Sequence, residues 1–593
     1  MKSKNPKSLF KMLISLIINT FKACPIYFTF KSFIELMLGT FLALNIIALQ
    51  SLFDEVSISL TDDRMYGKLI IDLIFLFICI EANPFLNCIN TIIYGDFEKK
   101  VTLKFEYLFN QKCSKINPID FENTSILDEI DKAKKGIINS VRLVTSVMDA
   151  VFIYLPYFVI VGIYLYNIKP SLIIIILVIF LPSLIAQIVK GKLFYNLEDT
   201  IAPIRREYNY YEQCITSREY FKETRILGAY QYFNKLYSKT LVILNQKNFK
   251  VKKKSTFMEL KLKVITISGY LITLILLTNN VLNGSITIGT FGAVLASYQL
   301  LTNMMNEFIS ITIGKVMKES GSVRNFVIFL EQPEKSGDKI TIDSAPEIIV
   351  DHASFNYPNR NEEAISDVSL VVHSGETVAI VGENGAGKST FVKLISGLYL
   401  PSKGKVSIGG YDTSEIDTSH LFMNISSVFQ NYQKYKISLE DNVAISDTET
   451  VIDENRVECA LNMADLNITN EVFSDGYKTI LSKEFDGTDL SGGQWQRIAI
   501  ARGLYKNHNM ILLDEPTAAI DPNEETIIYQ KFKEISKGKT SFIVTHRLGA
   551  AKIADRILVF SDGQILQDGT HNALINTEGK YRDMFYAQSK WYN

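Results

Sequence analysis

The sequence predicts a polytopic α-helical membrane domain, with six transmembrane helices and long cytoplasmic extensions, fused to an α/β domain built around a phosphate-binding loop. Three observations support this fold class. The long apolar runs fall within residues 1–330, and a Gly-rich turn separates a predicted strand from a predicted helix at residues 382–388. Charge divides at the same place, with 37 Lys and Arg against 25 Asp and Glu up to residue 330, and 25 against 38 beyond it. We therefore expect a membrane domain with an N-terminal interfacial helix at 1–330, a linker at 331–345 and the second domain at 346–593.

Six apolar stretches are long enough to cross the hydrocarbon core of a bilayer, which takes about 20 helical residues. The fourth, SLIIIILVIFLPSLIAQIV, contains no charged residue. A buried core helix could imitate one such run, but soluble helices average about 11–12 residues, so six imitations are implausible. The predicted crossings are 33–53, 69–94, 143–167, 170–189, 264–283 and 285–314.

Lys and Arg in the connecting segments predict the orientation, because cytoplasmic loops are enriched in them. The segments 95–142 and 190–263 carry nine and sixteen of these residues, whereas the short turns hold only Arg64 and Lys169. The two long basic segments are therefore expected in the cytoplasm. With six crossings, the N- and C-termini are expected there as well.

The two long cytoplasmic segments are too periodically apolar for disordered linkers, so we expect them to extend the membrane helices. Pro118 and Asn123 interrupt the first segment, and Gly228 lies in a break of the second. These breaks could be simple turns. Their length and position instead favour short elements, around Asp120–Asp128 and Tyr220–Ala229, that dock onto a soluble domain.

The segment TVAIVGENGAGKSTFVKLISGL runs from a predicted strand through a Gly-rich turn into an apolar-periodic helix. It matches G-x-x-x-x-G-K-[ST] in the structural setting that this pattern requires. Glycines let backbone N–H groups converge on phosphate oxygens, and the helix N-terminus adds a favourable dipole. Lys388 can bring a positive charge to the outer phosphates, and the Ser389 hydroxyl can ligate Mg²⁺. The predicted phosphate-binding residues are Gly382, Glu383, Asn384, Gly385, Ala386, Gly387, Lys388, Ser389 and Thr390.

Two carboxylates, Asp514 and Glu515, follow the predicted buried strand Met510–Leu513. Such a pair could be a solvated turn, but beside a phosphate loop Asp514 is expected to support Mg²⁺ and Glu515 to polarise attacking water. His546 ends the apolar strand SFIVTH, and we expect it to sense the γ-phosphate and to contact Glu515. The remaining histidines show no such placement and are expected at the surface: His352, His373, His420, His508 and His571.

Together these residues resemble an ABC transporter over essentially the whole chain. The resemblance rests on the phosphate loop 382–390, Gln430 in SVFQNY, LSGGQ at 490–494, ILLDEP at 511–516, AAID at 518–521 and His546. It implies ATP and Mg²⁺ as cofactors and ATP hydrolysis coupled to transport. It also implies that Tyr357 stacks on adenine and that Gln430 links Mg²⁺ and attacking water to the membrane domain.

The LSGGQ segment contains no nucleophile–base pair, no metal-ligand cluster and no obvious catalytic acid. In the family that the chain resembles, it caps the γ-phosphate bound by the opposite subunit. Ser491 and the N–H groups of Gly492 and Gly493, at a predicted helix start, suit that anion. Gln494 and Asp521 are assigned to the same nucleotide site. Because the chain has one membrane half and one ATPase half, we expect a homodimer, with a related half-transporter as the alternative partner.

The six crossings with long cytoplasmic extensions resemble an exporter of the type IV fold, and no peptidase is expected ahead of the first crossing. The segments DFENTSILDEI, YFKETRILGAYQYF and FQNYQKYKISLEDNVAISD, with Trp495, resemble lantibiotic or bacteriocin exporters of the bacterial cytoplasmic membrane. A multidrug or lipid exporter carrying a small amphipathic substrate is the alternative, although LSKEFDGTDL lacks the G-E-R-G common among those proteins. An importer of this fold ranks third. The membrane runs exclude a soluble translation or repair ATPase, so no nucleic-acid partner is expected, and Glu515 argues against an ATP-gated channel.

Carboxylates inside a membrane span are costly and usually face a protein interior or a water-filled pathway. Asp72 and Glu81 fall in the second predicted crossing, Asp149 at the start of the third and Glu307 in the sixth, with no basic residue inside those spans. Asp72 and Asp149 could instead lie at the membrane interfaces. We expect Asp72, Glu81 and Glu307 to line an acidic substrate pathway that favours a cationic peptide.

Overall fold

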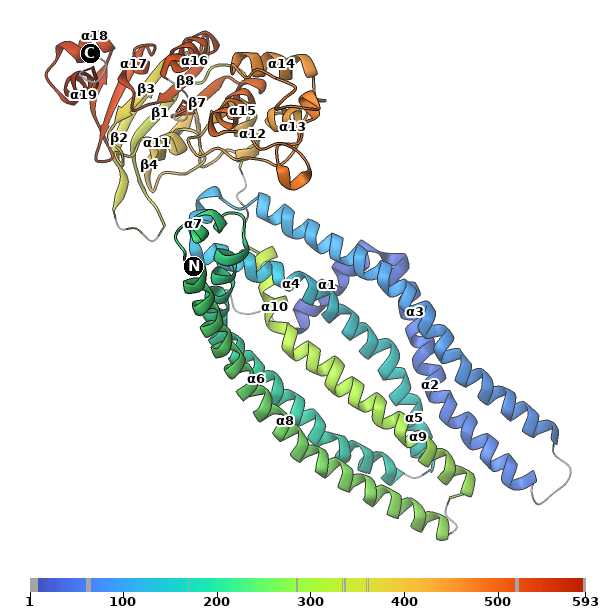
Figure 1. The fold of residues 1–593 in the computed structure, drawn as a ribbon. Coiled ribbons are helices and arrows are strands. Elements are labelled where there is room, and N and C mark those ends of the chain that lie inside the picture. The colour runs from blue at the N-terminus through green and yellow to red at the C-terminus, as the bar shows by residue number, and fades with distance from the viewer. Residues whose placement is uncertain are drawn as a thin grey trace. The chain divides into compact units, whose positions relative to one another are not determined.

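The structure is a computed structural model that describes residues 9–59, 66–168, 170–283, 286–332, 334, 337–358, 360, 362–517 and 522–589. Its internal contacts divide the chain into two compact units (Figure 1). The first unit holds residues 1–114 and 128–332, and the second holds residues 115–127 and 333–593. The predicted boundaries did not anticipate that residues 115–127 belong to the second unit.

Long helices make up the first unit, and each predicted crossing overlaps one of six long helical segments. The crossing 264–283 extends one residue beyond α8, and the crossing 285–314 begins before the start of α9. These segments are α2 (Pro25–Ser59), α3 (Tyr66–Ser114), α4–η2–α5 (Thr124–Asp149, Ala150–Tyr154, Leu155–Ile168), α6 (Pro170–Thr216), α8 (Tyr230–Leu282) and α9–η3–α10 (Ile288–Glu307, Phe308–Ile313, Gly314–Leu330). The shorter α1 (Leu9–Ala23) precedes them, and α7 (Phe221–Ile226) joins α6 to α8. The long segments run well beyond the predicted crossings, so the two basic segments do extend membrane helices.

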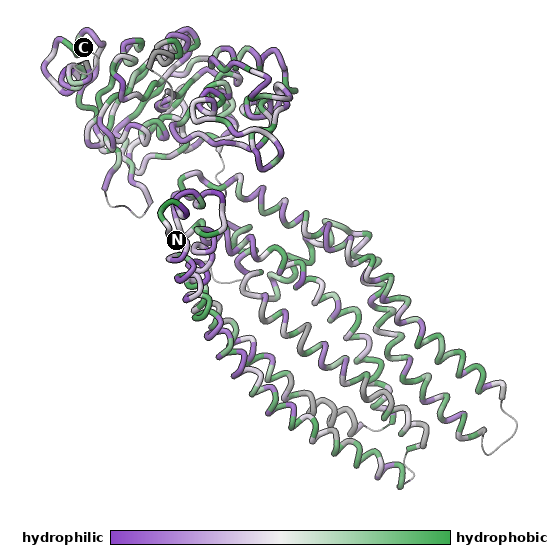
Figure 2. Tube along the Cα trace, in the orientation of Figure 1, coloured by the Kyte–Doolittle hydropathy of each residue, from purple (hydrophilic) through white to green (hydrophobic). Residues whose placement is uncertain are grey.

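Four of these helical segments are long and apolar enough to cross a membrane, counting the described residues alone. They are Pro25–Ile58, Gly67–Ser114, Thr124–Ile168 and Tyr230–Leu282, with mean hydropathies of 1.8 to 2.1 in their most apolar windows. Apolar residues run along much of α2, α3 and α8 (Figure 2). The other two predicted crossings, 170–189 and 285–314, fall on α6 and α9–η3–α10, which do not meet this criterion over the residues described.

Two π-helical segments, η2 and η3, interrupt the helices of the first unit, and each directly follows a carboxylate, Asp149 or Glu307. They meet through aromatic rings, because Tyr154 of η2 lies 5.4 Å from Phe308 of η3, centre to centre. A π-helical turn places an extra residue in a helix and often marks a functional site. The two segments also approach each other at Glu307, because the Tyr154 hydroxyl lies 3.4 Å from its carboxylate.

Two β-sheets with a helix between them form the core of the second unit. An antiparallel sheet has the strand order β2-β1-β4-β5, and a mostly parallel sheet has the order β10-β9-β3-β8-β7-β6 (Figure 1). Apolar side chains of both sheets and of α11 pack into one buried cluster. The strands are β1 (Ile348–Asn356), β2 (Glu363–Val372), β3 (Thr377–Gly382), β4 (Lys403–Ile408), β5 (Tyr411–Asp412), β6 (Ile425–Val428), β7 (Met510–Asp514), β8 (Thr540–Val544), β9 (Arg556–Ser561) and β10 (Gln564–Gly569).

A second buried cluster joins the parallel sheet to a group of helices that includes α13, α14, α15 and α16. Every residue of β7 and β8 is buried, as expected for central parallel strands covered on both faces. The helices of this unit are η1 (Pro118–Glu122), α11 (Lys388–Ile395), α12 (Thr418–Met423), α13 (Leu439–Ala444), α14 (Glu454–Met463), η4 (Gly476–Lys478), η5 (Lys483–Phe485), α15 (Gly492–Tyr505), α16 (Pro522–Ile535), α17 (Leu548–Ala551), α18 (His571–Asn576) and α19 (Lys580–Ser589).

The segment 115–127 packs into the second unit through its short helix η1. Ile119 contacts the apolar cluster between the sheets, and the Glu122 carboxylate accepts a hydrogen bond of 2.6 Å from the Tyr399 hydroxyl. Lys393 lies 3.9 Å from the same carboxylate. The first predicted short element, around Asp120–Asp128, therefore does contact the α/β unit, although its partners Lys393 and Tyr399 carried no recognisable signal in the sequence.

Candidate functional site

Side chains predicted from four separate motifs meet at the carboxyl ends of the parallel strands. The phosphate loop follows β3, Gln430 follows β6, Asp514 ends β7 with Glu515 next to it, and His546 follows β8. Crevices at the carboxyl ends of strands are where open parallel sheets bind ligands. The sheet topology therefore assembles the site from four segments spread over residues 382–546.

The Gly-rich loop between β3 and α11 depends on its glycines for steric reasons. Gly382, Gly385 and Gly387 all have positive φ angles, of 150°, 85° and 99°. A side chain at Gly382 would place its Cβ 2.4 Å from the Phe560 carbonyl oxygen, and one at Gly387 would lie 2.7 Å from that of Ala364. Neither carbonyl can move without disturbing a strand, so the loop keeps its shape only with glycine at these positions.

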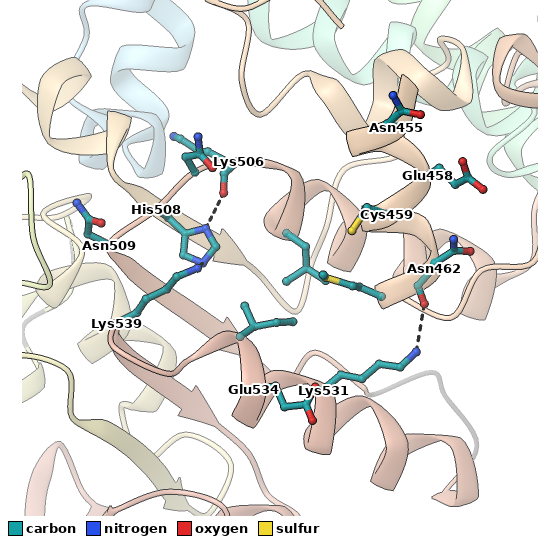
Figure 3. Close-up of a pocket in the computed structure, with 14 residues that line it drawn as sticks. Asn455, Glu458, Cys459, Asn462, Lys506, His508, Asn509, Lys531, Glu534 and Lys539 are labelled. Atoms are coloured by element: carbon teal, nitrogen blue, oxygen red, sulfur yellow. Dashed lines mark hydrogen bonds between the residues drawn. The ribbon is translucent and has the colours of Figure 1, made fainter. Parts of the chain in front are cut away.

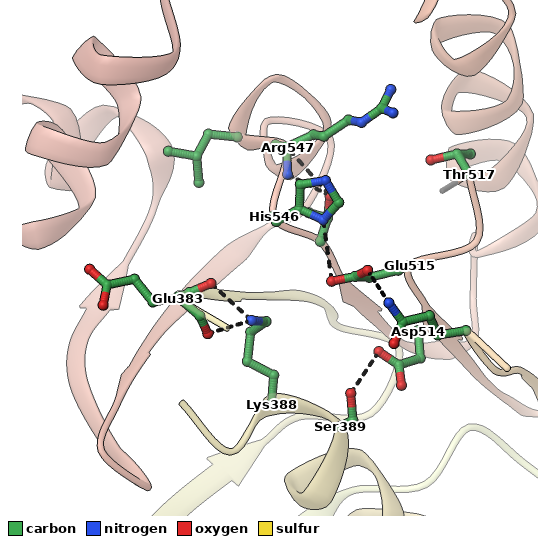
Figure 4. A network of polar contacts seen from close by, with 12 residues as sticks. Glu383, Lys388, Ser389, Asp514, Glu515, Thr517, His546 and Arg547 are labelled. Atoms are coloured by element: carbon green, nitrogen blue, oxygen red, sulfur yellow. Dashed lines mark hydrogen bonds and ion pairs between the residues drawn. The ribbon is translucent and has the colours of Figure 1, made fainter. Parts of the chain in front are cut away.

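Lys388 opens α11 and folds back over the phosphate loop (Figure 4). Its Nζ donates hydrogen bonds to the carbonyl oxygens of Gly382, at 2.9 Å, and Glu383, at 2.8 Å. Only 6% of the residue is exposed, and this burial lowers the pKa of the ammonium group, while Glu515 and Asp514 act in the opposite direction. The cation is thus held inside the loop, next to the two carboxylates.

Ser389 and Asp514 form the second pair of the site (Figure 4). The Ser389 hydroxyl donates a 3.2 Å hydrogen bond to Oδ1 of Asp514. Asp514 is only 5% exposed, and its burial raises the pKa of the carboxyl group, although the bond from Ser389 opposes that shift. A hydroxyl and a carboxylate are the hard oxygen ligands that Mg²⁺ prefers, so this donor set fits the ion.

Glu515 is held at both carboxylate oxygens. The side-chain amide of Gln430 donates to Oε2 at 2.7 Å, and Nδ1 of His546 lies 3.2 Å from Oε1 (Figure 4 labels Glu515 and His546). The backbone of Glu515 has a φ angle of +47°, and its N–H donates to the Val544 carbonyl at 3.0 Å. A positive φ is strained for a residue with a side chain, and such strain concentrates at functional sites.

Tyr357 lies beside the start of α11. Its hydroxyl is 3.1 Å from the Thr390 hydroxyl, and its ring packs edge-on against Phe355 and Tyr399. The aromatic residue is therefore fixed next to the phosphate loop, on the side of the antiparallel sheet.

The LSGGQ segment begins helix α15, with Ser491 as the N-cap residue. The Ser491 hydroxyl accepts from the Gln494 N–H, and the Gln494 side chain accepts from the Ser491 N–H, which forms a capping box. Ser491 and Gly492 are exposed, and within the part of the chain that the structure describes no hydrogen bond joins residues 491–494 to the phosphate loop. The helix start is therefore open on the side that an external anion would approach, while Asp521 lies outside the described residues.

Two of the carboxylates in the predicted crossings, Asp72 and Asp149, have a lysine nearby. Lys31 lies close to Asp149, and Lys68 lies close to Asp72 while it pairs with Glu55 at 2.6 Å. Both lysines lie just outside the predicted crossings, and each forms its ion pair with another carboxylate, Glu35 or Glu55.

Neither Glu81 nor Glu307 forms an ion pair among the residues described. Both are exposed in the single chain, on α3 and at the end of α9. The structure does not bring Asp72, Glu81 and Glu307 into one cluster; Glu307 contacts Tyr154 instead.

The expectation that the other five histidines lie at the surface is wrong for His508, which is 7% exposed. It lies at the start of β7, beside Lys506 and Lys539. A sequence offers no periodicity signal for a single polar residue that precedes a strand, so only the tertiary structure shows its burial.

Residues 365–518, which hold the phosphate loop, Gln430, LSGGQ and Glu515, match the family model described as ABC transporter. The chain carries the ATPase domain of an ABC transporter. A solved structure of a bacterial Atm1-family ABC exporter with ATP bound superposes with a TM-score of 0.73 over 94% of this chain and 97% of that one. At 18% identity this likeness shows the fold, an exporter-type helical membrane domain followed by an ABC ATPase domain.

Curated relatives of this ABC transporter align over different shares of its length. The subtilin transport ATP-binding protein SpaT of Bacillus subtilis is 28% identical over 84% of this chain and 82% of its own length. The nisin transport ATP-binding protein NisT of Lactococcus lactis is 26% identical over 88% of each chain. The ATP-dependent lipid A-core flippase of Escherichia coli is 32% identical over 51% of this chain and 52% of its own. The protein is thus a multi-pass ATP-driven ABC exporter that couples ATP hydrolysis to transport.

Proposed function

We propose that the exporter works as a homodimer that moves a cationic, lantibiotic-type peptide out of the cytoplasm of a bacterium, with both termini in the cytoplasm. The similarity to SpaT and NisT, which spans the membrane and ATPase halves together, carries this proposal. The multidrug and lipid relatives considered align over only 41–52% of this chain. Cargo contacts belong to the membrane half, so likeness across both halves is the better guide to cargo. A multidrug or lipid exporter remains the alternative.

The geometry of the ATPase half supports assigned roles for its residues. Lys388 and the loop N–H groups would hold the outer phosphates of ATP, and Ser389, Asp514 and Gln430 would hold Mg²⁺, which screens phosphate charge when bound. Glu515 would accept a proton from water, because Gln430 and His546 fix its two oxygens. Tyr357 would stack on adenine, next to Thr390.

The open start of α15 supports a composite site at a dimer interface. Ser491 and the N–H groups of Gly492 and Gly493 lie at the positive end of a helix dipole, where an anion is favoured. Residues 491–494 make no hydrogen bond to the phosphate loop of their own chain in the described structure. We therefore assign Ser491, Gly492, Gly493 and Gln494, together with Asp521, to the nucleotide bound by the partner chain. Two identical chains would then form two equivalent sites.

The unpaired carboxylates of the membrane half support a cationic cargo. Glu81 and Glu307 are exposed in the single chain and have no ion pair in the described structure, whereas lysines attend Asp72 and Asp149. The rings of Tyr154, Phe158 and Phe308 gather beside Glu307, with centroid separations of 5.4 to 6.4 Å. A carboxylate beside aromatic faces attracts ammonium and guanidinium groups.

Transport into inside-out vesicles tests cargo and direction together. We expect ATP-dependent uptake of a cationic lanthionine peptide, and little uptake of the same peptide after its lysines are acetylated. The double substitution Glu81→Gln with Glu307→Gln should reduce this uptake while leaving basal ATP turnover. Glu207→Gln, an exposed carboxylate of α6 beyond the predicted crossing, serves as the matched control. Equal transport of neutral drugs or lipids, unaffected by the double substitution, would favour the alternative exporter.

A further inference from the structure

A pocket of about 1050 Å³ opens in the ATPase unit at a distance from the nucleotide motifs (Figure 3). Its residues Asn509 and Lys539 directly precede strands β7 and β8, so the pocket lies at the amino ends of these strands. The phosphate loop, Glu515 and His546 follow the carboxyl ends of the same sheet. The pocket is therefore separate from the ATP site, and its volume is at the upper end of the range for small-molecule sites.

The buried His508 contacts the backbone of Lys506 and the side chain of Lys539 (Figure 3). Its Nδ1 donates to the Lys506 carbonyl oxygen at 2.6 Å, and its Nε2 accepts from Nζ of Lys539 at 3.1 Å. Burial, reinforced by the charges of Lys539 and Lys506, lowers the pKa of His508 to about 4. The imidazole is thus neutral at cytoplasmic pH and acts as a fixed acceptor that positions the Lys539 ammonium group.

Lys506 and Lys539 lack carboxylate partners. Within the described structure neither amine has an acidic oxygen at ion-pair distance; the Lys506 amine donates to the Phe422 carbonyl oxygen, and Asp447 and Glu449 act on it only from farther away. Burial lowers the pKa of both ammonium groups.

Lys531, on the opposite side of the pocket, provides the contrast, since it donates to the Asn462 carbonyl at 3.1 Å and lies 3.7 Å from Asp465. Partly buried cations without counter-ions are costly and are normally paired. Lys506 and Lys539, the lysine corner, therefore line the pocket without an acidic oxygen at ion-pair distance among the described residues.

The rest of the lining suits an apolar body rather than a bare ion. Met463 at the end of α14, Leu504 of α15 and Ile535 at the end of α16 also line the pocket. Glu458 lies on α14, away from His508 (Figure 3). We propose that this pocket binds an organic anion, with a phosphate or carboxylate head at Lys506 and Lys539 and an apolar body over Met463, Leu504 and Ile535. The carboxylates of Glu458 and Glu534 disfavour a second negative charge at the far end.

An occupant of this pocket would contact helix α15 at its C-terminal end, whereas LSGGQ lies at the N-terminal end of the same helix. Leu504 lies in the last turn of α15, whose first turn carries Gly492 and Gly493 of LSGGQ. Helices α14 and α16 also line the pocket, so the ligand would join three helices of the ATPase unit. Binding would therefore bear on the position of α15 without any contact to ATP.

Cys459 supplies a built-in reporter, because its exposed side chain lines the pocket. In the purified full-length protein, alkylation of Cys459 by a maleimide is followed by mass spectrometry as hexyl phosphate is added. We expect hexyl phosphate to slow this alkylation several-fold, whereas hexylammonium does not. Cys113, a partly exposed cysteine of the membrane unit beyond the predicted crossing, is the internal control and should react at a constant rate.

Substitutions then separate the anion corner from the rest of the pocket. Lys506→Gln and Lys539→Gln should each weaken protection by hexyl phosphate roughly 10-fold or more, because each removes a charged hydrogen-bond donor. Lys531→Gln, whose ammonium group is already paired, should leave protection unchanged. Equal protection by hexylammonium, or full protection in the Lys506→Gln and Lys539→Gln proteins, would overturn the proposal.

Inorganic phosphate tests whether the ligand needs an apolar body in addition to its anionic head. It should compete with hexyl phosphate without protecting Cys459 by itself, because an ion at the lysine corner does not reach α14. Full protection by inorganic phosphate alone would overturn the assignment of an apolar body. If a lysine variant fails to fold, the comparison of hexyl phosphate with hexylammonium on the unmodified protein still decides the charge preference.

Discussion

Replacing Glu515, the proposed general base, by Gln exchanges one carboxylate oxygen for an NH₂ group and keeps the size of the side chain. The replacement amide can still present its oxygen to Gln430, which donates to Oε2 at 2.7 Å in the structure. It can no longer accept a proton from water, and it loses the charge that attracts His546, 3.2 Å away. The substitution therefore tests general-base chemistry with little change in packing.

The expected loss of turnover follows from the role of the carboxylate. General-base catalysis contributes about 10²–10⁴-fold to a rate. That factor corresponds to about 2.7–5.5 kcal/mol of the activation free energy. ATP binding should persist, because the hydrogen bonds of Lys388 go to Gly382 and Glu383 and not to Glu515.

The assay measures steady-state ATP hydrolysis and equilibrium ATP binding on the same purified full-length preparation. Glu471→Gln, an exposed carboxylate of the ATPase unit, is the control and should turn over ATP normally. Glu515→Gln should also accumulate as a nucleotide-bound closed dimer, visible by cross-linking. Near-normal hydrolysis by Glu515→Gln would refute the assignment, and so would a loss of ATP binding as large as the loss of turnover.

Three further predictions follow from the same structure. Mixing Lys388→Ala chains with Ser491→Ala chains should give more ATPase activity than either variant alone. Some mixed dimers then carry both substitutions in one composite site and leave the other site intact. ATPase activity of isolated monomers that does not depend on protein concentration would contradict this prediction. Glu122→Gln weakens the bond from the Tyr399 hydroxyl and should lower transport per ATP hydrolysed with ATP binding intact, and an unchanged ratio would argue against coupling through η1. Because the folded pKa of His508, about 4, lies below its usual value near 6.5, the unfolded chain binds more protons between these values. Stability should therefore fall as pH drops through this window, by at most about 3 kcal/mol, and the melting temperature of His508→Asn should depend less on pH there.

The sequence predicted those elements whose cause is local. The apolar runs anticipated the long helices, and the pattern around Lys388 anticipated β3, the loop and α11, because glycine and hydrophobic periodicity act over a few residues. The pairing of Glu515 with His546 could be expected from two strand ends of one parallel sheet. The loop around Lys388 and its structural setting lie in one short stretch of chain, and the Glu515–His546 pair required only that two strands be neighbours in one sheet.

Features that depend on tertiary contacts did not follow from the sequence. Lys31 reaches Asp149 across more than a hundred residues, so a search for basic residues inside one span could not find it. The π-helical segments η2 and η3 begin after Asp149 and Glu307 with no marker residue of their own. The burial of His508 likewise arises from packing between β7, β8 and their neighbours. Such contacts are selected by the shape of the folded unit and not by periodicity.

The ATPase unit takes thirteen residues, 115–127, from the first half of the chain, and this has a consequence for the order of synthesis. Ribosomes add about 5–20 residues per second, so this segment waits roughly 10–40 s before residue 333 even appears. During that interval Ile119 and Glu122 have no Tyr399 to pack against. The membrane helices must therefore be inserted while residues 115–127 still lack the rest of the ATPase unit to pack against. A gene cut between the two halves would give an ATPase fragment whose missing surface belongs to the other polypeptide.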